Sequence, residues 1–146
     1  PYIQNGIQSL QAVPHRQQLV KGNGITIIDD SFNSNPDGAR LALDTLAMFD
    51  TRKVVMTPGL VELGKNEEQE NEKLGEYISA IADVVLLVGK KRSLVLNRAL
   101  KRCGFGGDIY VYESLKDCEN DFSNTLKFGD TLLILNDLPD IFDDKV

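Results

Sequence analysis

The densest group of side chains that could do chemistry is the run of residues 29–36, which reads Asp-Asp-Ser-Phe-Asn-Ser-Asn-Pro. It follows residues 25–28, a β-branched and almost wholly apolar stretch that is typical of a buried strand. Carboxylates in this run can accept hydrogen bonds from a ribose or from a substrate ammonium group, and its amides can both donate and accept. The same residue types also serve in turns and helix caps, so the run alone favours a binding loop and a structural turn equally.

Two further polar loops follow later apolar stretches. Residues 57–64 contain two glycines and one acid, Glu62. Glycine allows a close backbone approach or a positive φ, although a bulged loop with its leucines packed inward explains the pattern as well. Residues 136–140 begin with Asn136, and Asn and Asp before a proline are also ordinary turn residues.

The pair His15-Arg16 lies just ahead of the first predicted strand. The planar guanidinium of Arg16 suits a phosphate clamp, because it bonds two oxygens at once. The alternative is a surface arginine that pairs with an acid, which is worth about 0–1 kcal/mol. His15, the single histidine, also suits the last turn of a helix.

The elements that must position these loops follow from apolar periodicity and from turn residues. Gly22-Asn23-Gly24 predicts a hairpin between strands 17–21 and 25–30. Further strands are predicted at 53–57, 84–88, 109–111 and 131–135, and helices at 2–12, 36–49, 66–81, 92–103 and 114–126, the third of them capped by Asn66. This alternation predicts a single α/β domain with a mostly parallel, doubly wound (Rossmann-like) sheet and an N-terminal β-hairpin. Ligands of such sheets bind beyond the carboxyl ends of the strands, which here means just after residues 28, 57, 88, 111 and 135.

Composition excludes several classes of protein. The 146 residues carry a net charge of −6, and no Lys/Arg-rich face suggests a reader of nucleic-acid phosphates. Two cysteines are too few for a disulfide framework and fit a reducing compartment. The sequence has no P-loop, no G-x-G-x-x-G after the first strand, no Cys/His cluster for zinc and no G-x-S-x-G elbow.

Two loop motifs, together with Pro14-His15-Arg16 and the hairpin, resemble a known family. Pro14-His15-Arg16, the glycine-containing hairpin and the run Ile-Ile-Asp-Asp-Ser-Phe-Asn-Ser-Asn-Pro resemble the start of the C-terminal domain of the Mur ligases. Residues 59–64, Gly-Leu-Val-Glu-Leu-Gly, are similar to a second loop of that domain, Gly-Asp-Met-x-Glu-Leu-Gly. The resemblance covers essentially the whole chain, and it is greatest to the members that add D-alanyl-D-alanine to a UDP-N-acetylmuramoyl-tripeptide.

This resemblance implies a cytoplasmic, ATP-dependent ligase of peptidoglycan synthesis. ATP phosphorylates the precursor carboxylate, the incoming amine attacks the acyl phosphate, and an amide, ADP and phosphate result. Residues 1–14 would be the tail of a central ATPase domain, which holds most of the contacts to ATP and Mg²⁺, and residues 15–146 the C-terminal domain. The partners implied are the chain's own N-terminal and central domains, the UDP-N-acetylmuramoyl-peptide and D-alanyl-D-alanine. A chain without the central domain is expected to be inactive alone.

The resemblance also assigns roles to individual residues, and it assigns no metal ligand to any residue of this chain. Arg16 matches a catalytic arginine that approaches the ATP phosphates. The residues matched to the nucleotide are His15, Arg16, Asp30 and Asn33, and those matched to the substrate are Phe32, Asn33, Asn35, Glu62 and Asn136.

Three alternatives stay open. Residues 136–139 read Asn-Asp-Leu-Pro where many of these ligases have a Lys-Gly-Ser-Arg-like run, so a divergent Mur-type ligase with another amine substrate is one. A non-catalytic α/β module that binds a nucleotide or a peptide is the second. The third is a phosphoacceptor receiver domain, which the sequence disfavours because neither the Asp after the third strand nor the Lys after the fifth is present.

Overall fold

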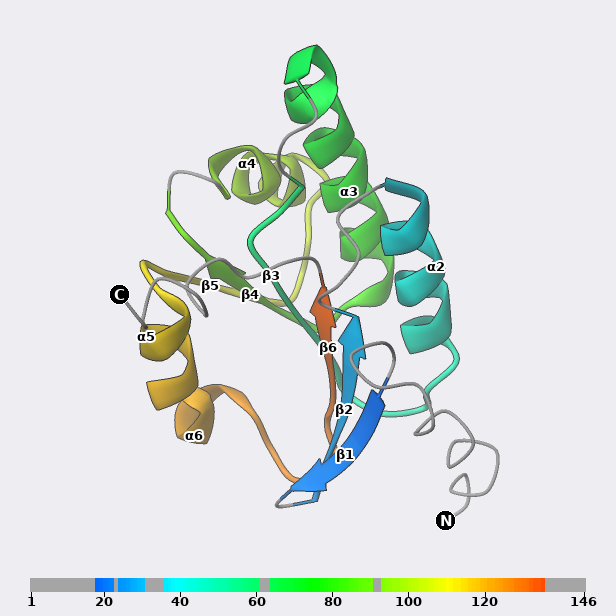
Figure 1. The fold of residues 1–146 in the computed structure, drawn as a ribbon, viewed down its shortest axis with the longest axis vertical. Helices are drawn as coiled ribbons and strands as arrows, with labels where there is room; N and C mark the ends of the chain where they lie inside the picture. The colour runs from blue at the N-terminus through cyan, green and yellow to red at the C-terminus, as the bar shows by residue number, and fades with distance from the viewer. Residues whose placement is uncertain (1–17, 23, 31–35, 61–63, 91–92, 136–146) are drawn as a thin grey trace.

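The computed structural model of the chain is a six-stranded sheet with helices on both faces (Figure 1). The structure describes residues 18–22, 24–30, 36–60, 64–90 and 93–135. The strands lie in the order β1-β2-β6-β3-β4-β5. Their bounds are β1 Gln18–Gly22, β2 Ile25–Asp30, β3 Lys53–Thr57, β4 Val84–Val88, β5 Asp108–Tyr112 and β6 Thr131–Leu135. The last strand along the chain, β6, therefore lies inside the sheet, between β2 and β3.

Only β1 runs against its neighbour. It pairs with β2 in an antiparallel hairpin, and Gly24 at the turn has a φ of +78°, which favours glycine. The other five strands are parallel to one another. These findings confirm the predicted α/β class, the mostly parallel sheet and the N-terminal hairpin.

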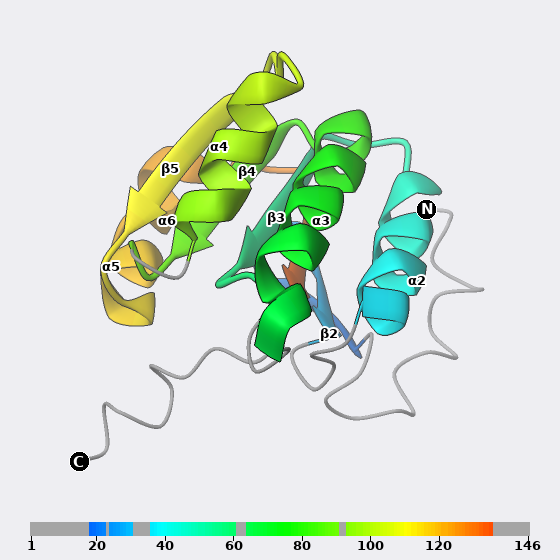
Figure 2. The same ribbon diagram turned by 90° about the horizontal axis from the view of Figure 1, so that it is seen from above.

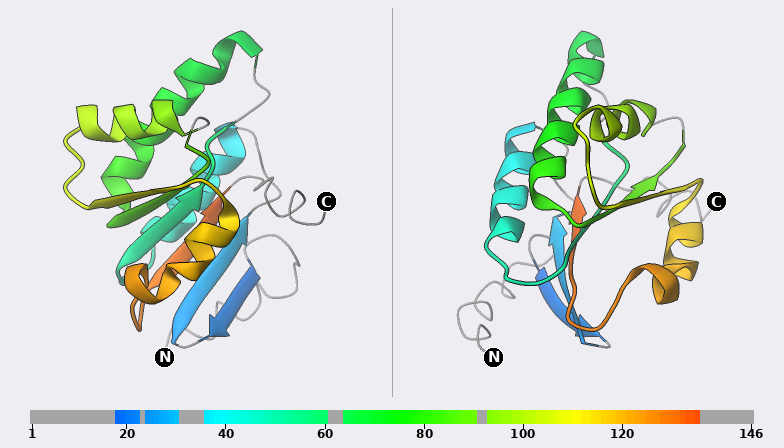
Figure 3. Two further views of the ribbon diagram at one scale, coloured as in Figure 1. Left: turned by 90° about the vertical axis from the view of Figure 1, so that its left-hand side faces the viewer. Right: turned by 180° about the vertical axis from the view of Figure 1, so that it is seen from behind.

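The helices cover the sheet unequally. The helices α2 (Pro36–Ala47), α3 (Glu67–Ile81) and α4 (Leu94–Arg102) lie on one face, and the short helices α5 (Leu115–Asn120) and α6 (Phe122–Thr125) lie on the other (Figures 1 and 2). The two further views show the same division, with the hairpin at one edge of the sheet (Figure 3). This arrangement follows from right-handed crossovers, since the connection from β5 back to β6 runs in the opposite direction from the earlier ones.

Side chains alternate between the two faces of each strand, so the sheet builds two cores. In β3, Val55 joins the core under α2, α3 and α4, whereas Val54 and Met56 join the core under α5. The first core is completed mainly by Ile28, Leu43, Leu46, Ile78, Val85, Leu87, Leu96, Leu100 and Leu133. The second is completed by Val84, Leu86, Val88, Leu115, Cys118 and Leu132.

Some predicted helix boundaries were wrong. The helix expected over 36–49 ends at Ala47, and the one expected over 114–126 is broken at Asp121 into α5 and α6. The carboxylate of Asp121 accepts hydrogen bonds from the Tyr112 hydroxyl at 2.6 Å and from the Asn124 amide at 2.7 Å, and the Asp121 backbone has a φ of −97° and a ψ of 3°. These contacts hold the chain in a turn at Asp121, although the helical periodicity of the apolar residues continues through it.

Helix ends agree with the expected capping in two of three cases. Asn66 makes no side-chain cap bond at α3, because it already belongs to a 3₁₀ turn, η2 (Gly64–Asn66). Ser114 caps α5 by accepting a hydrogen bond from the Asp117 N–H at 3.1 Å. Gly104, with a φ of +73°, ends α4 as predicted. The helix expected over residues 2–12 lies outside the described residues.

Candidate functional site

The carboxyl ends of β2, β6 and β3 meet at one edge of the sheet. Asp30 pairs with Leu135 across β2 and β6, and Met56 pairs with Ile134 across β3 and β6. Thr57 is therefore level with Leu135. Residues 30, 57 and 135 thus end their strands side by side, at the place where ligands of a doubly wound sheet bind.

Asp30 is the last residue of β2 and is only 2% exposed. Because side chains alternate along a strand, it lies on the same face as Ile28, under the helices α2, α3 and α4. Asp29 is half-buried on the opposite face. The two neighbouring carboxylates thus serve different sides of the sheet, and Asp30 is the one beside α2.

The turn that leaves β3 is held by two buried side chains. The Thr57 hydroxyl accepts a hydrogen bond from the Gly59 N–H at 3.0 Å, and Gly59 has a φ of +91°. The Asn71 side chain, from α3, accepts from the Leu60 N–H at 2.8 Å and donates to the Leu60 carbonyl, also at 2.8 Å. Residues 57–60 are all buried, so the start of this loop is well defined.

A groove of about 780 Å³ runs between α2 and α3 and reaches the same edge of the sheet. Pro36 and Leu60 line the end of the groove that is nearest to the carboxyl ends of the strands. Tyr77, from α3, reaches across the groove and donates a hydrogen bond to Asp44 of α2. This bond to Asp44 is the main cause of the raised pKa of Tyr77. The charged residues that line the groove are Asp37, Arg40, Glu70, Lys73 and Glu76.

Two helices also begin at this edge. The crossover geometry directs the N-termini of α2 and α3 toward the carboxyl ends of the strands, where their free N–H groups carry partial positive charge. Such ends favour anionic ligand groups. Among the described residues, no group of three or more His, Cys, Asp or Glu side chains could hold a metal ion.

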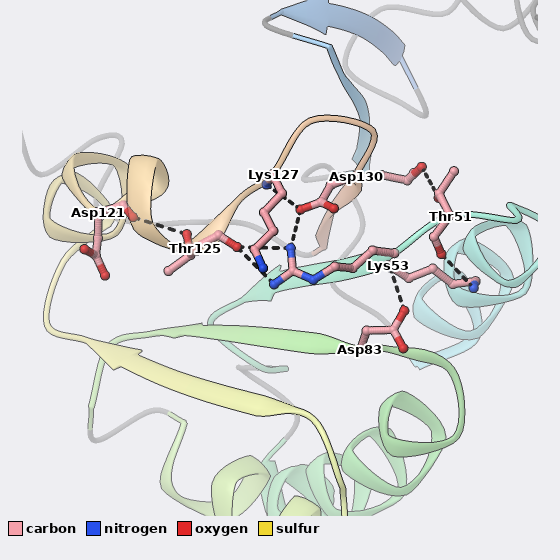
Figure 4. A network of polar contacts seen from close by, with 9 residues as sticks. Thr51, Lys53, Asp83, Asp121, Thr125, Lys127 and Asp130 are labelled. Carbon is pink, nitrogen blue, oxygen red and sulfur yellow. Dashed lines mark hydrogen bonds and ion pairs between the residues drawn. The ribbon is translucent and has the colours of Figure 1, made fainter.

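A different polar network lies at the opposite edge, where β3 and β6 begin (Figure 4). The Arg52 guanidinium donates to the buried Asp130 carboxylate at 2.6 Å, and the Lys127 N–H donates to the same oxygen at 2.7 Å. The hydroxyls of Thr51 and Thr131 are 2.7 Å apart. These contacts join the starts of two strands and lie far from the candidate site, so we regard them as structural.

The structure describes one of the predicted site residues, Asp30. The other predicted residues lie outside the described residues: His15, Arg16, Phe32, Asn33, Asn35, Glu62 and Asn136. Sequence reasoning missed Asn71. Its signal was a polar residue in the apolar stripe of α3, because residues 71, 74, 75 and 78 are the buried ones and have helical spacing.

Comparison with known proteins tests the family resemblance that the sequence motifs indicated. The family model described as "Mur ligase, glutamate ligase domain" matches residues 15–136. The chain belongs to the Mur ligase family. This confirms the resemblance that the two loop motifs predicted.

The Mur ligase relatives are similar in sequence over part of this chain. The UDP-N-acetylmuramoyl-tripeptide–D-alanyl-D-alanine ligase of Mycobacterium tuberculosis is 35% identical over 89 residues, which cover 55% of this chain and 17% of that enzyme. The enzyme of the same name from Escherichia coli is 33% identical over 93 residues, which cover 61% of this chain and 20% of the enzyme. The chain therefore spans about a fifth of the length of these relatives.

Solved structures of the family share the fold. MurF ligase from Thermotoga maritima, in complex with ADP, has a TM-score of 0.66 and 21% identity over 86% of this chain and 28% of its own. MurF from Acinetobacter baumannii has a TM-score of 0.68 and 20% identity, with the same coverage. No helix in the part of the chain that the structure describes is long and apolar enough to cross a membrane.

Proposed function

We propose that this chain is the C-terminal domain of a cytoplasmic, ATP-dependent amide ligase that adds D-alanyl-D-alanine to a UDP-N-acetylmuramoyl-peptide. The observation that carries the proposal is the family match over residues 15–136, together with curated relatives of that name. The geometry agrees with it, since three loop starts and two helix N-termini share one edge of the sheet.

In this proposal the chain binds and orients the reactants. ATP supplies the phosphoryl group that activates the precursor carboxylate. Asp30 would accept a hydrogen bond from a ribose hydroxyl, and its burial in β2 keeps the carboxylate in one position. Arg16 would neutralise phosphate charge, with His15 and Asn33 beside the nucleotide. Mg²⁺ would be held mainly by the central domain, as the family resemblance implies.

Phe32, Asn33, Asn35, Glu62 and Asn136 would face the incoming dipeptide. D-Alanyl-D-alanine carries an ammonium group and a carboxylate, so amide side chains, which both donate and accept, suit it. Residues 1–14 would connect this domain, residues 15–146, to the central domain.

The test is ligation by the full-length protein that contains these residues. We expect ADP release that requires both the UDP-N-acetylmuramoyl-tripeptide and D-alanyl-D-alanine, and no ATP turnover by the 146-residue chain alone. Arg16→Ala should raise the barrier of the chemical step by about 2–4 kcal/mol, as for the loss of one oxyanion donor. ADP release with other amines but not with D-alanyl-D-alanine would instead indicate a divergent ligase, and turnover by the isolated chain would refute the proposal.

A further inference from the structure

Asn71 is a buried amide that binds the loop leaving β3 rather than its own helix alone. It is 3% exposed and lies in the second turn of α3. Its Nδ2 donates to the Leu60 carbonyl at 2.8 Å and to the Glu67 carbonyl at 2.9 Å, while its Oδ1 accepts from the Leu60 N–H at 2.8 Å. One side chain thus satisfies both backbone groups of Leu60.

These contacts use both N–H donors of the Asn71 amide and one acceptor site of its oxygen. An aspartate at the same position would keep the acceptor but would place a carboxylate against two carbonyl oxygens. A leucine would leave the buried N–H and C=O of Leu60 without partners, which is costly in a dry environment. The position of Leu60 therefore depends on the chemical identity of residue 71, more than on its size.

Leu60 lines the groove between α2 and α3 at the end nearest to the carboxyl ends of the strands. The charged side chains along this groove are three acids and two bases, with a net charge of −1: Asp37, Glu70 and Glu76 against Arg40 and Lys73. Glu76 also pairs with Arg102 at 3.0 Å, so the charges of the two signs nearly balance along the groove, and a zwitterion finds groups of both signs there. The mixture of acids and bases along the groove suits the ammonium and carboxylate groups of the amine substrate in the proposed reaction.

We infer that Asn71 is a positioning residue for the zwitterionic amine substrate, acting through Leu60 at the mouth of the α2–α3 groove. The inference rests on the proposed function and deepens it. Asn71 touches neither reactant in this account. It fixes the turn 57–60, and with it Leu60, at the end of the groove where the dipeptide would bind.

The experiment uses the full-length protein and compares Asn71→Asp with wild type. We expect the KM for D-alanyl-D-alanine to rise about tenfold or more, with the KM for ATP within twofold of wild type. Hydrogen exchange of the Leu60 amide should accelerate in the variant, because the carbonyl oxygens of Leu60 and Glu67 repel the new carboxylate and displace it from the Leu60 N–H. If Asn71→Asp does not fold, Asn71→Ser, which keeps one donor and one acceptor, is measured in its place.

Two control variants separate positioning from loss of stability. Gln69→Glu makes the same amide-to-acid change at an exposed position of α3, and we expect it to leave both KM values unchanged. Ile78→Val removes one buried methyl group from the same helix and leaves the hydrogen bonds of Asn71 intact, so it should lower stability but not change the KM for the dipeptide.

The outcomes distinguish this inference from the proposed function. A wild-type protein that does not ligate D-alanyl-D-alanine overturns the proposed function and the inference that rests on it. An active wild-type protein whose Asn71 variants raise both KM values equally, or neither, leaves the proposed function standing and overturns the inference.

Discussion

The ion pair between Arg52 and Asp130 offers a quantitative test of how the sheet is held at its amino edge. Asp130 precedes β6 and is 2% exposed, and its carboxylate accepts from Arg52 at 2.6 Å and from the Lys127 N–H at 2.7 Å. Its backbone carbonyl accepts from the Thr26 N–H at 3.0 Å, so three strands start beside this residue. We consider two changes, Asp130→Ala and Asp130→Asn.

The expected losses follow from which partners each change leaves behind. Asp130→Ala leaves the Lys127 N–H without an acceptor, which costs about 1–3 kcal/mol. Breaking a buried pair by removing one partner costs about 3–5 kcal/mol in total, and we expect the lower end here, because Arg52 is 29% exposed and water takes over part of its solvation. Asp130→Asn keeps the acceptor for Lys127 and loses the charge, so we expect about 1–2 kcal/mol.

The assay is urea unfolding of the chain, read as the free energy of unfolding with the slope m compared among variants. Glu68→Gln is the control, since it removes a charge from the exposed pair with Arg98 and should change stability by about 0–0.5 kcal/mol. An Asp130→Asn variant as stable as Glu68→Gln would show that the desolvation of Asp130 cancels its attraction to Arg52, so that the ion pair does not stabilise the start of β6.

Three other expectations concern single positions. Gly24→Ala should destabilise by about 1–2 kcal/mol, because Gly24 has a φ of +78° and an added Cβ would overlap the exposed ring of Phe128, which must turn away. Gly106→Ala should be neutral, because an added Cβ there meets no atom within 4 Å, and thermal unfolding compares the two variants. Burial raises the pKa of the Cys118 thiol to about 12, so iodoacetamide at pH 8 should label it only after unfolding. The hydrogen bond from Tyr112 lowers the pKa of Asp121, and Tyr112→Phe should raise that pKa toward its ordinary value in an NMR titration. A lowered carboxyl pKa stabilises the protein above the unfolded pKa, so the stability lost in Tyr112→Phe should shrink as the pH falls below about 4.

Local sequence carried most of the fold. The predicted strands 25–30, 53–57, 84–88 and 131–135 agree with β2, β3, β4 and β6, because runs of β-branched and apolar residues between turn residues have few alternatives. The hairpin followed from the glycines around Asn23. The break at Asp121 was missed because its cause is a hydroxyl on another element, that of Tyr112, nine positions away.

The sequence predicted where in the fold the candidate site lies, but not the contacts that hold it. Parallel strands bring their carboxyl ends to one edge, so the loops after residues 30, 57 and 135 could be expected to meet there. The grip of Asn71 on Leu60 could not, because it depends on how closely α3 approaches the loop after β3. Helical periodicity identifies a polar residue on a buried face, but it does not identify the partner.

The place of β6 has a consequence for how the protein is made. Of the six strands, β6 is the last to leave the ribosome, yet it lies between β2 and β3, which do not pair with each other. Until residues 131–135 have been synthesised, both strands expose an unpaired inner edge, and the nascent domain has a gap at its centre. The sheet is therefore completed only after residues 131–135 have been synthesised, and we expect a chain truncated before Thr131 to be degraded rather than to form a smaller domain.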